Sequence, residues 1–337
     1  MILNSFTILM LFISFITGLL SFILLFSSLS LYRKTLTVFN VEGRVLVEER
    51  SHLLLVIAIT VFIIKLLIWP FLYVTLQSYI PYVQGAMCIF GVTQVQSGFS
   101  VLIQIIKPFV FFSLGAWLIV NKIDERTERA LLQRKGFLLL SGASLLSLLD
   151  SLIDILYFSG FDIKTSVACC TTVFDLPEKR FTATLSSVFI GKEYQGFIMP
   201  LYYLSNLFFL SLMISILVYY RYKGSYPLVL VTGAGLMGLI NGAVTLIATF
   251  EVIAPRVTGL PDHHCLYCLW QYAPVSIPFT AFFIIGTLSP LWAVVIQFFR
   301  HDKLHSVIIN DYMKRLYLLG IGLNVSITFT VAIEHVV

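Results

Sequence analysis

The sequence contains few charged residues: Asp, Glu, Lys and Arg together make up 12% of its 337 residues, against about 25% in an average soluble domain. Segments polar enough to form a soluble domain are also missing, whereas 58% of the residues are hydrophobic and 29 are Phe. The apolar residues occur in runs of about 20 or more, which excludes a β-barrel with its alternating segments of about 10 residues. Since lipid satisfies no backbone polar group, the sequence predicts an all-α, polytopic membrane bundle.

Hydropathy, together with the helix-breaking residues between the apolar runs, predicts eight transmembrane helices. The whole chain, 1–337, is interpreted as one integral membrane domain. The first apolar stretch follows no basic segment and is too long for the core of a cleaved signal peptide, so we expect it to be retained. The longest connection is the segment 161–196. The expected spans are 3–31, 53–76, 99–121, 136–160, 197–220, 227–251, 273–298 and 315–335.

Lys and Arg alternate between the connecting segments. Fifteen of the 22 lie in or directly beside the segments 32–52, 122–135, 221–226 and 299–314, and five lie in the opposite loops. The positive-inside rule makes the first set cytoplasmic and both termini extracytoplasmic. We expect a bacterial or archaeal cytoplasmic membrane, with lipid as a partner. The formal charge of +5 reflects this placement and does not indicate binding to nucleic acid.

No cysteine lies in an expected span. All five, Cys88, Cys169, Cys170, Cys265 and Cys268, fall in the three loops predicted to be extracytoplasmic. Free cysteine is a common apolar filler, so unconstrained placement would put some of the five inside helices. Their common location on the oxidising side indicates crosslinking or chemistry at that face.

The strongest local motif is the C-x-x-C pair Cys265 and Cys268, expected at the entry of the seventh span and preceded by His263 and His264. This spacing brings two sulfur atoms within disulfide reach, and a helix N-terminus favours the thiolate, which suits thiol–disulfide exchange. Two imidazoles beside two thiolates also suit a soft metal, Zn or Cu. A structural disulfide that staples the loop is the third interpretation.

The adjacent cysteines Cys169 and Cys170 seldom bridge to each other, because the eight-membered ring strains the planar trans peptide. Each is expected to pair elsewhere, or both to bind one metal ion. Cys88 is the obvious disulfide candidate for one of them. An odd total leaves at least one thiol outside any disulfide within the chain.

The segment from Cys265 to Cys268, with Gln271 three residues later, resembles the C-x-x-C segments of membrane disulfide-generating enzymes of the DsbB and vitamin K epoxide reductase types. In the latter family, loop cysteines lie between the first two helices and the C-x-x-C opens the fourth. Expected spans four to seven follow this order. The chain departs from the pattern in having adjacent loop cysteines, Tyr272 in place of the DsbB-type Arg, and four further spans.

The resemblance implies that electrons pass from the thiols of an extracytoplasmic protein through the loop cysteines to the C-x-x-C pair, and then to a membrane quinone. Tyr267, Trp270 and Tyr272 would line the pocket of the quinone ring. The same aromatic residues are also typical of the interfacial belt of a membrane protein.

Four charged residues lie inside expected spans and away from the span ends: Lys65, Lys107, Asp150 and Asp154. A single charge at the bilayer centre costs at least about 2.5–3.5 kcal/mol, so we expect the four to face the bundle interior and pair. Asp150 and Asp154 are four residues apart and share one helix face. The set indicates either a proton path or polar cofactor site leading toward the cysteine-bearing face, or ion pairs that only fix the helices together.

The sixth span carries a face of small residues, Gly233, Gly235, Gly238 and Gly242, beside Asn241. Glycines at such spacing are typical of close helix packing.

Three functions remain open from the sequence. The first is a membrane thiol–disulfide oxidoreductase. The second is a soft-metal binding or transport protein that uses the extracytoplasmic Cys and His residues. The third is a subunit of a larger membrane complex, in which disulfides only staple the loops and other membrane subunits are the partners.

Overall fold

The computed structural model describes residues 4–37, 41–126, 133–167, 195–259, 265–299 and 303–336, and all regular secondary structure in these residues is helical. Eight helical stretches are long and apolar enough to cross a membrane, and each overlaps one of the eight expected spans. The predicted all-α membrane fold is therefore confirmed. The eight stretches are Ser5–Thr35, Val47–Gln77, Ile89–Glu125, Gln133–Ser159, Gly196–Lys223, Leu228–Thr258, Ser276–Phe298 and Val307–Ala332.

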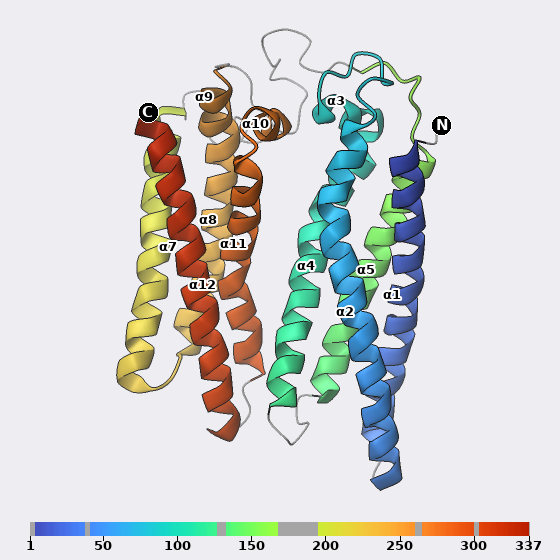
Figure 1. The fold of residues 1–337 in the computed structure, drawn as a ribbon. Coiled ribbons are helices and arrows are strands. Elements are labelled where there is room, and N and C mark those ends of the chain that lie inside the picture. The colour runs from blue at the N-terminus through green and yellow to red at the C-terminus, as the bar shows by residue number, and fades with distance from the viewer. Residues whose placement is uncertain are drawn as a thin grey trace. The chain divides into compact units, whose positions relative to one another are not determined.

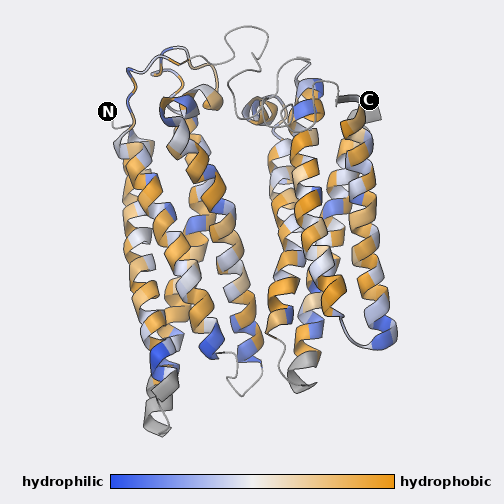
Figure 2. Cartoon of the chain, turned by 180° about the vertical axis from the view of Figure 1, so that it is seen from behind, coloured by the Kyte–Doolittle hydropathy of each residue, from blue (hydrophilic) through white to orange (hydrophobic). Residues whose placement is uncertain are grey.

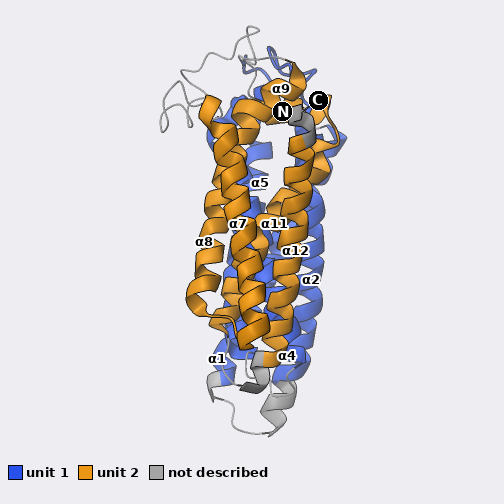
Figure 3. Cartoon of the chain, turned by 90° about the vertical axis from the view of Figure 1, so that its left-hand side faces the viewer, with its two compact units in different colours: residues 1–169 blue, residues 170–337 orange. Residues whose placement is uncertain are grey.

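The chain divides into two compact units, residues 1–169 and 170–337, which Figure 3 colours separately. The boundary falls inside 161–196, the segment expected to be the longest loop. Of this segment, 168–194 lie outside the described residues.

Unit 1 contains four long helices, α1 (Ser5–Thr37), α2 (Val41–Gln77), α4 (Ser97–Glu125) and α5 (Gln133–Ser159), with the short helix α3 (Ile89–Thr93) and a 3-10 turn (Gln94–Gln96) before α4 (Figure 1). Each long helix packs against the next in the chain, and α5 packs against α1. Thr7 and Tyr79 join the start of α1 to the end of α2 by a hydrogen bond of 2.6 Å between their hydroxyl groups. We call this the N-terminal end of unit 1.

Unit 2 contains the long helices α7 (Gln195–Lys223), α8 (Leu228–Ala248), α11 (Ser276–Phe298) and α12 (Lys303–Val336), again each packed on the next, with α12 packed on α7. Three short elements separate α8 from α11: the π-helical turn η3 (Thr249–Ile253), α9 (Ala254–Thr258) and α10 (Leu266–Tyr272) (Figure 1). Both units are therefore four-helix bundles in which spatial neighbours follow chain order.

The C-x-x-C pair does not open the seventh span, as the sequence suggested, but belongs to the separate helix α10. Cys265 is its N-cap residue, and α10 ends seven residues later at Tyr272. Ala273, which precedes Pro274, has φ −126° and ψ 80°, outside the helical region. Proline disfavours the helical conformation in the residue before it, which explains the break between α10 and α11.

The outward faces of the helices are apolar along most of their length (Figure 2). On α1, the side chains of Phe12, Phe15 and Phe26 are 57–60% exposed, whereas the polar side chains of Ser14 and Ser21 are fully buried. Lipid accepts apolar side chains without cost, so small polar residues can occupy the packed face of α1, where they allow close packing beside Met10 and Leu24.

The glycine face of α8 packs against α11, as the sequence predicts. A Cβ atom on Gly238 would lie 3.2 Å from Cγ of Pro290, and one on Gly242 would lie 3.1 Å from Cγ2 of Thr287. At Gly233, on the same helix, a Cβ atom would meet nothing within 4 Å. The close approach of α8 and α11 therefore depends on Gly238 and Gly242 but not on Gly233.

We expect Gly238→Leu to lower the free energy of unfolding by about 1–3 kcal/mol, because the new side chain forces α8 away from Pro290. Thermal unfolding in detergent measures the effect. Gly233→Leu is the matched control and is expected to leave the melting temperature almost unchanged. Equal losses in the two variants would contradict the glycine-mediated contact.

Candidate functional site

The four charged residues inside the spans of unit 1 form one ion-pair network, which we call the charge cluster. Lys65 on α2 donates to Oδ2 of Asp150 at 2.7 Å. Lys107 on α4 donates to Oδ1 of Asp150 and to both carboxylate oxygens of Asp154, each at 3.0 Å. No side chain of the four is more than 4% exposed. The pairing expected from the sequence is present.

The charges of the cluster balance, with two ammonium groups and two carboxylates. Asp150 and Asp154 lie one turn apart on α5, so both face the lysines of the neighbouring helices. Each carboxylate oxygen of these two aspartates accepts at least one charge-assisted hydrogen bond. The cost of placing four ions in a helical bundle is offset only by such complete pairing.

A small cavity of about 10 Å³ lies beside the cluster, against Lys65, Lys107 and Asp150. This volume is about the least that holds one water molecule. Phe62 of α2 and Phe111 of α4 also line the cavity and stack on each other with ring centroids 5.7 Å apart. The cavity thus combines charged groups with an aromatic wall.

A row of hydroxyl groups follows the contact between α1 and α5, and sequence reasoning missed it. Thr7, Ser14, Ser21 and Ser28 are spaced by seven residues on α1, and all four are fully buried. This seven-residue repeat in an otherwise apolar helix is the signal that would have indicated a buried polar face.

Two hydrogen bonds join the hydroxyls of α1 to those of α5. Ser21 bonds to Ser147 at 2.8 Å, and Thr17 bonds to Ser151 at 3.2 Å. Ser151 also accepts a hydrogen bond of 2.7 Å from Lys65, so the hydroxyls contact the charge cluster. We call Thr7, Ser14, Thr17, Ser21 and Ser28 with Ser144, Ser147 and Ser151 the hydroxyl row.

A larger cavity, of about 280 Å³, lies at the end of unit 1 opposite its N-terminal end, where α2 and α5 begin and α4 ends. Glu48, His52 and Asp124 are among its polar lining residues, and Trp117 and Leu140 form part of its apolar lining. We call this cavity the vestibule.

In unit 2, the Sγ atoms of Cys265 and Cys268 lie within 4.8 Å of each other. The two side chains are buried, with 4% and 7% exposure. A disulfide needs a sulfur–sulfur distance of about 2.05 Å, so the two sulfur atoms must move closer together to form one. Helix α10 has only seven residues, and its dipole therefore contributes little to thiolate stability.

An apolar cavity of about 130 Å³ lies next to the C-x-x-C helix. Leu266 and Leu269 of α10 line it, together with residues of α8, the π-helical turn, α11 and α12. Thr245 of α8 also lines the cavity, and its hydroxyl group is buried without a hydrogen-bond partner among the described residues. The sequence did not indicate this cavity.

The three aromatic residues expected around a quinone ring do not line this cavity. Tyr267 is buried and contacts Trp270 edge to face at 5.6 Å, whereas Tyr272 is 65% exposed. The indole of Trp270 donates a hydrogen bond of 3.1 Å to Thr280, which does line the cavity. Trp270 therefore contacts a residue of the cavity wall but does not line the cavity itself.

Of the remaining predicted sulfur and imidazole ligands, Cys88 lies among the described residues. Cys88 belongs to unit 1, where it is buried as the N-cap of α3. Cys169 and Cys170, like His263 and His264, lie outside the described residues. Their expected roles in disulfide exchange or in Zn or Cu binding stay predictions.

The spans that carry the resemblance to disulfide-generating enzymes correspond to α5, α7, α8 and α11. Helix α5 belongs to unit 1 and the other three belong to unit 2. The four helices are therefore not those of one compact bundle.

Comparison of the chain with protein-family models, with curated proteins and with solved structures gives no significant match.

We expect Lys65→Met and Asp150→Asn each to lower the free energy of unfolding by about 3–5 kcal/mol, because each leaves a buried charge without its partner. The double variant removes both charges. Its loss in the free energy of unfolding is expected to be smaller than the sum of the losses in the two single variants. Unfolding in detergent measures this double-mutant cycle.

The exposed pair of Lys122 and Glu125, 2.8 Å apart, is the control. Lys122→Met is expected to change the free energy of unfolding by no more than about 1 kcal/mol. Additive losses in the Lys65 and Asp150 cycle would mean that the two groups are not energetically coupled.

Proposed function

We propose that the protein is a membrane thiol–disulfide oxidoreductase that uses Cys265 and Cys268 as its reactive pair. The observation that carries this proposal is the apolar cavity that adjoins the helix bearing both cysteines. A structural staple needs no such cavity. A redox pair needs a site for the group that reoxidises it.

In the first half of the proposed reaction, a thiolate of an extracytoplasmic dithiol protein attacks one sulfur atom of the Cys265–Cys268 disulfide. The disulfide breaks, a mixed disulfide forms, and the second thiol of the substrate resolves it. The substrate leaves with a disulfide, and Cys265 and Cys268 become a dithiol. Cys169 and Cys170 are the predicted relay cysteines for this exchange, and Cys88 is the predicted disulfide partner of one of them.

In the second half, the dithiol returns to the disulfide and gives up two electrons and two protons. A membrane quinone, when bound, accepts two electrons and two protons. The size of the cavity supports this class of acceptor: 130 Å³ is close to the volume of about 150 Å³ of a known apolar cavity that binds benzene, so it suits one six-membered ring.

Thr245 is the residue proposed to orient the ring. Its hydroxyl group is buried and lacks a hydrogen-bond partner among the described residues, which costs about 1–3 kcal/mol unless a ligand supplies one. A quinone carbonyl oxygen accepts a hydrogen bond from such a group. The apolar side chains of Leu266 and Leu269 would pack against the ring.

The proposal predicts that the purified protein reduces a short-chain quinone with dithiothreitol as the dithiol donor. Cys265→Ser and Cys268→Ser are each expected to lower this rate at least about a hundredfold, because neither variant forms the disulfide. Quinone absorbance measures the rate, and mass tagging of thiols measures the redox state of the pair.

Retention of Cu or Zn at one ion per chain, lost in Cys265→Ser and accompanied by no quinone reduction, would support the soft-metal interpretation instead. Full quinone reduction by Cys268→Ser would contradict the proposal.

A second prediction concerns Thr245→Val, which keeps the side-chain shape and removes the hydroxyl group. We expect the KM for quinone to rise about fivefold, as one hydrogen bond of about 1 kcal/mol is lost. The matched control is Thr232→Val on the same helix, where the exposed hydroxyl donates to the carbonyl groups of Leu228 and Val229. Equal KM values in both variants would remove Thr245 from the proposed ring site.

A further inference from the structure

The charge cluster of unit 1 has no part in the thiol chemistry proposed for unit 2. Helix packing alone does not require it, since well-packed apolar residues of the same volume stabilise a bundle as well as a buried ion pair or better. Ionisable residues inside spans are instead typical of ion paths and proton relays. The surroundings of the cluster distinguish a role in helix packing from a role in an ion path or proton relay.

Lys65 is the member of the cluster with a hydrogen-bond donor to spare. The ammonium group of Lys107 makes three contacts, all to carboxylate oxygens. The ammonium group of Lys65 has three N–H donors and makes two contacts, one to Asp150 and one to Ser151. Lys65 also lines the cavity of about 10 Å³. A water molecule there would accept the third N–H of Lys65.

The hydroxyl row extends from this point along the whole bundle. Thr7 and Ser28 are about 31 Å apart along α1, close to the thickness of the hydrocarbon core. A hydroxyl group can both donate and accept a hydrogen bond, as proton hopping requires. The hydroxyl group of Ser14 is fully buried and has no hydrogen-bond partner among the described residues, which leaves it available to a further water molecule.

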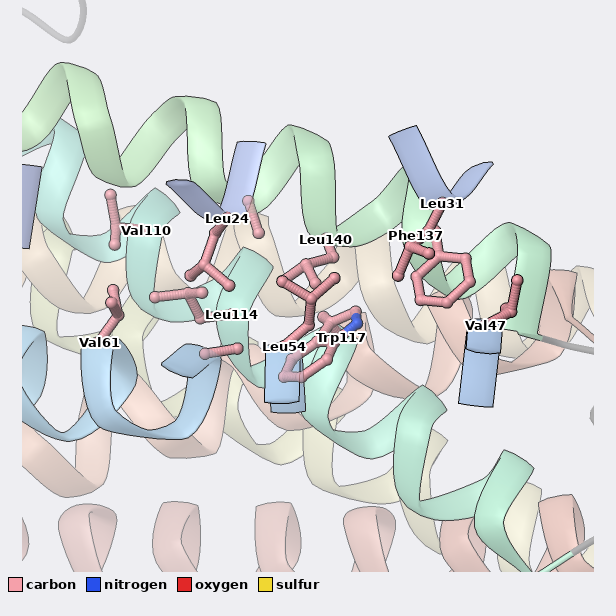
Figure 4. Close-up of a cluster of buried hydrophobic side chains, with 12 residues drawn as sticks. Leu24, Leu31, Val47, Leu54, Val61, Val110, Leu114, Trp117, Phe137 and Leu140 are labelled. Carbon is pink, nitrogen blue, oxygen red and sulfur yellow. The ribbon is translucent and has the colours of Figure 1, made fainter. Parts of the chain in front are cut away.

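An apolar layer separates the charge cluster from the vestibule. On α2 it extends over about 16 Å, from Leu54 at the vestibule to Lys65. Figure 4 shows part of the layer, in which Leu54 lies beside Trp117 and Leu114 lies beside Leu24. A hydrated metal cation has no space to cross this layer. A proton that moves between hydroxyl groups does not need such a space.

We infer that unit 1 conducts protons from one end of the bundle to the other, along the hydroxyl row and through Lys65, with water molecules joining the hydroxyl groups that do not contact one another. In each step one O–H or N–H bond breaks and one forms. Lys65 gives a proton to Ser151, to which it donates a hydrogen bond, and takes one from the cavity water, while Ser151 passes its own proton to Thr17. Nothing is consumed, and one positive charge moves. This inference is independent of the proposed redox function.

Charged and titratable groups surround the route from three of the four helices. Helix α1 contributes the hydroxyl groups of the row. The other elements contribute Lys65 and Tyr73 on α2, Lys107 on α4, and Asp150 and Asp154 on α5. Tyr79, just after α2, bonds through its hydroxyl group to that of Thr7.

The test uses the full chain in vesicles of phosphatidylcholine and phosphatidylglycerol that enclose a pH-sensitive dye. A potassium gradient with valinomycin drives protons across the membrane. The wild-type protein is expected to change the internal pH faster than protein-free vesicles do. The charge-neutral double variant Lys65→Gln/Asp150→Asn and the hydroxyl variant Ser21→Ala/Ser147→Ala are each expected to lower the flux about tenfold or more.

Thr60→Ala is the matched hydroxyl control, because Thr60 is exposed on α2 and its hydroxyl group donates to the carbonyl of Val56. It is expected to keep the wild-type flux. Wild-type flux no greater than that of empty vesicles, or unchanged flux in either double variant, would overturn the inference.

Leu114→Ser tests the route without removing any member of it. A hydroxyl group in the apolar layer admits water and is expected to raise the proton flux. The rise supports the inference if it disappears when Lys65→Gln/Asp150→Asn is added. An equal rise in both backgrounds overturns it, because protons would then bypass the charge cluster.

Discussion

A charge inside the hydrocarbon core must find its opposite charge within the protein, and this constraint organises unit 1. Asp150 accepts from lysines of two different helices, so α2 and α4 are both held to α5 by a single carboxylate. The contact of α1 with α5 continues the same polar interior through hydroxyl groups. Outside this core the helices present Phe and Leu to lipid, where apolar side chains need no partner.

Unit 2 is assembled by a different means. Unit 1 is held together by charged groups, whereas the sixth span, in unit 2, carries glycines. Gly238 and Gly242 bring α8 against α11. Above this contact the π-helical turn and the short helices α9 and α10 replace a regular continuation of the bundle. An irregular segment packs less completely than a continuous helix, and the apolar cavity lies among these elements. The thiol pair thus adjoins the part of unit 2 that has space for a ligand.

Several features of both units follow from local chemistry and were predictable. The eight spans depend on run length, the pairing of Lys65 and Lys107 with two aspartates depends on the cost of a bare charge, and the glycine face depends on spacing. The position of the C-x-x-C pair was predicted less well. Pro274 marked a helix boundary, but it did not indicate that α10 would stand apart from α11. The cavity beside α10 is lined by residues of six elements, so no pattern within one segment predicts it.

The sequence by itself determined that this protein is a helical membrane bundle with buried ion pairs and with cysteines outside the expected spans. These properties depend on solvation, which acts on each segment separately. Only the tertiary structure decided that the chain forms two units, that Lys65 and Lys107 share Asp150, and that Leu266 and Leu269 rather than the neighbouring aromatic residues face a cavity. Such features depend on how side chains from distant segments fill the same volume, and packing of this kind has no signature within any one segment.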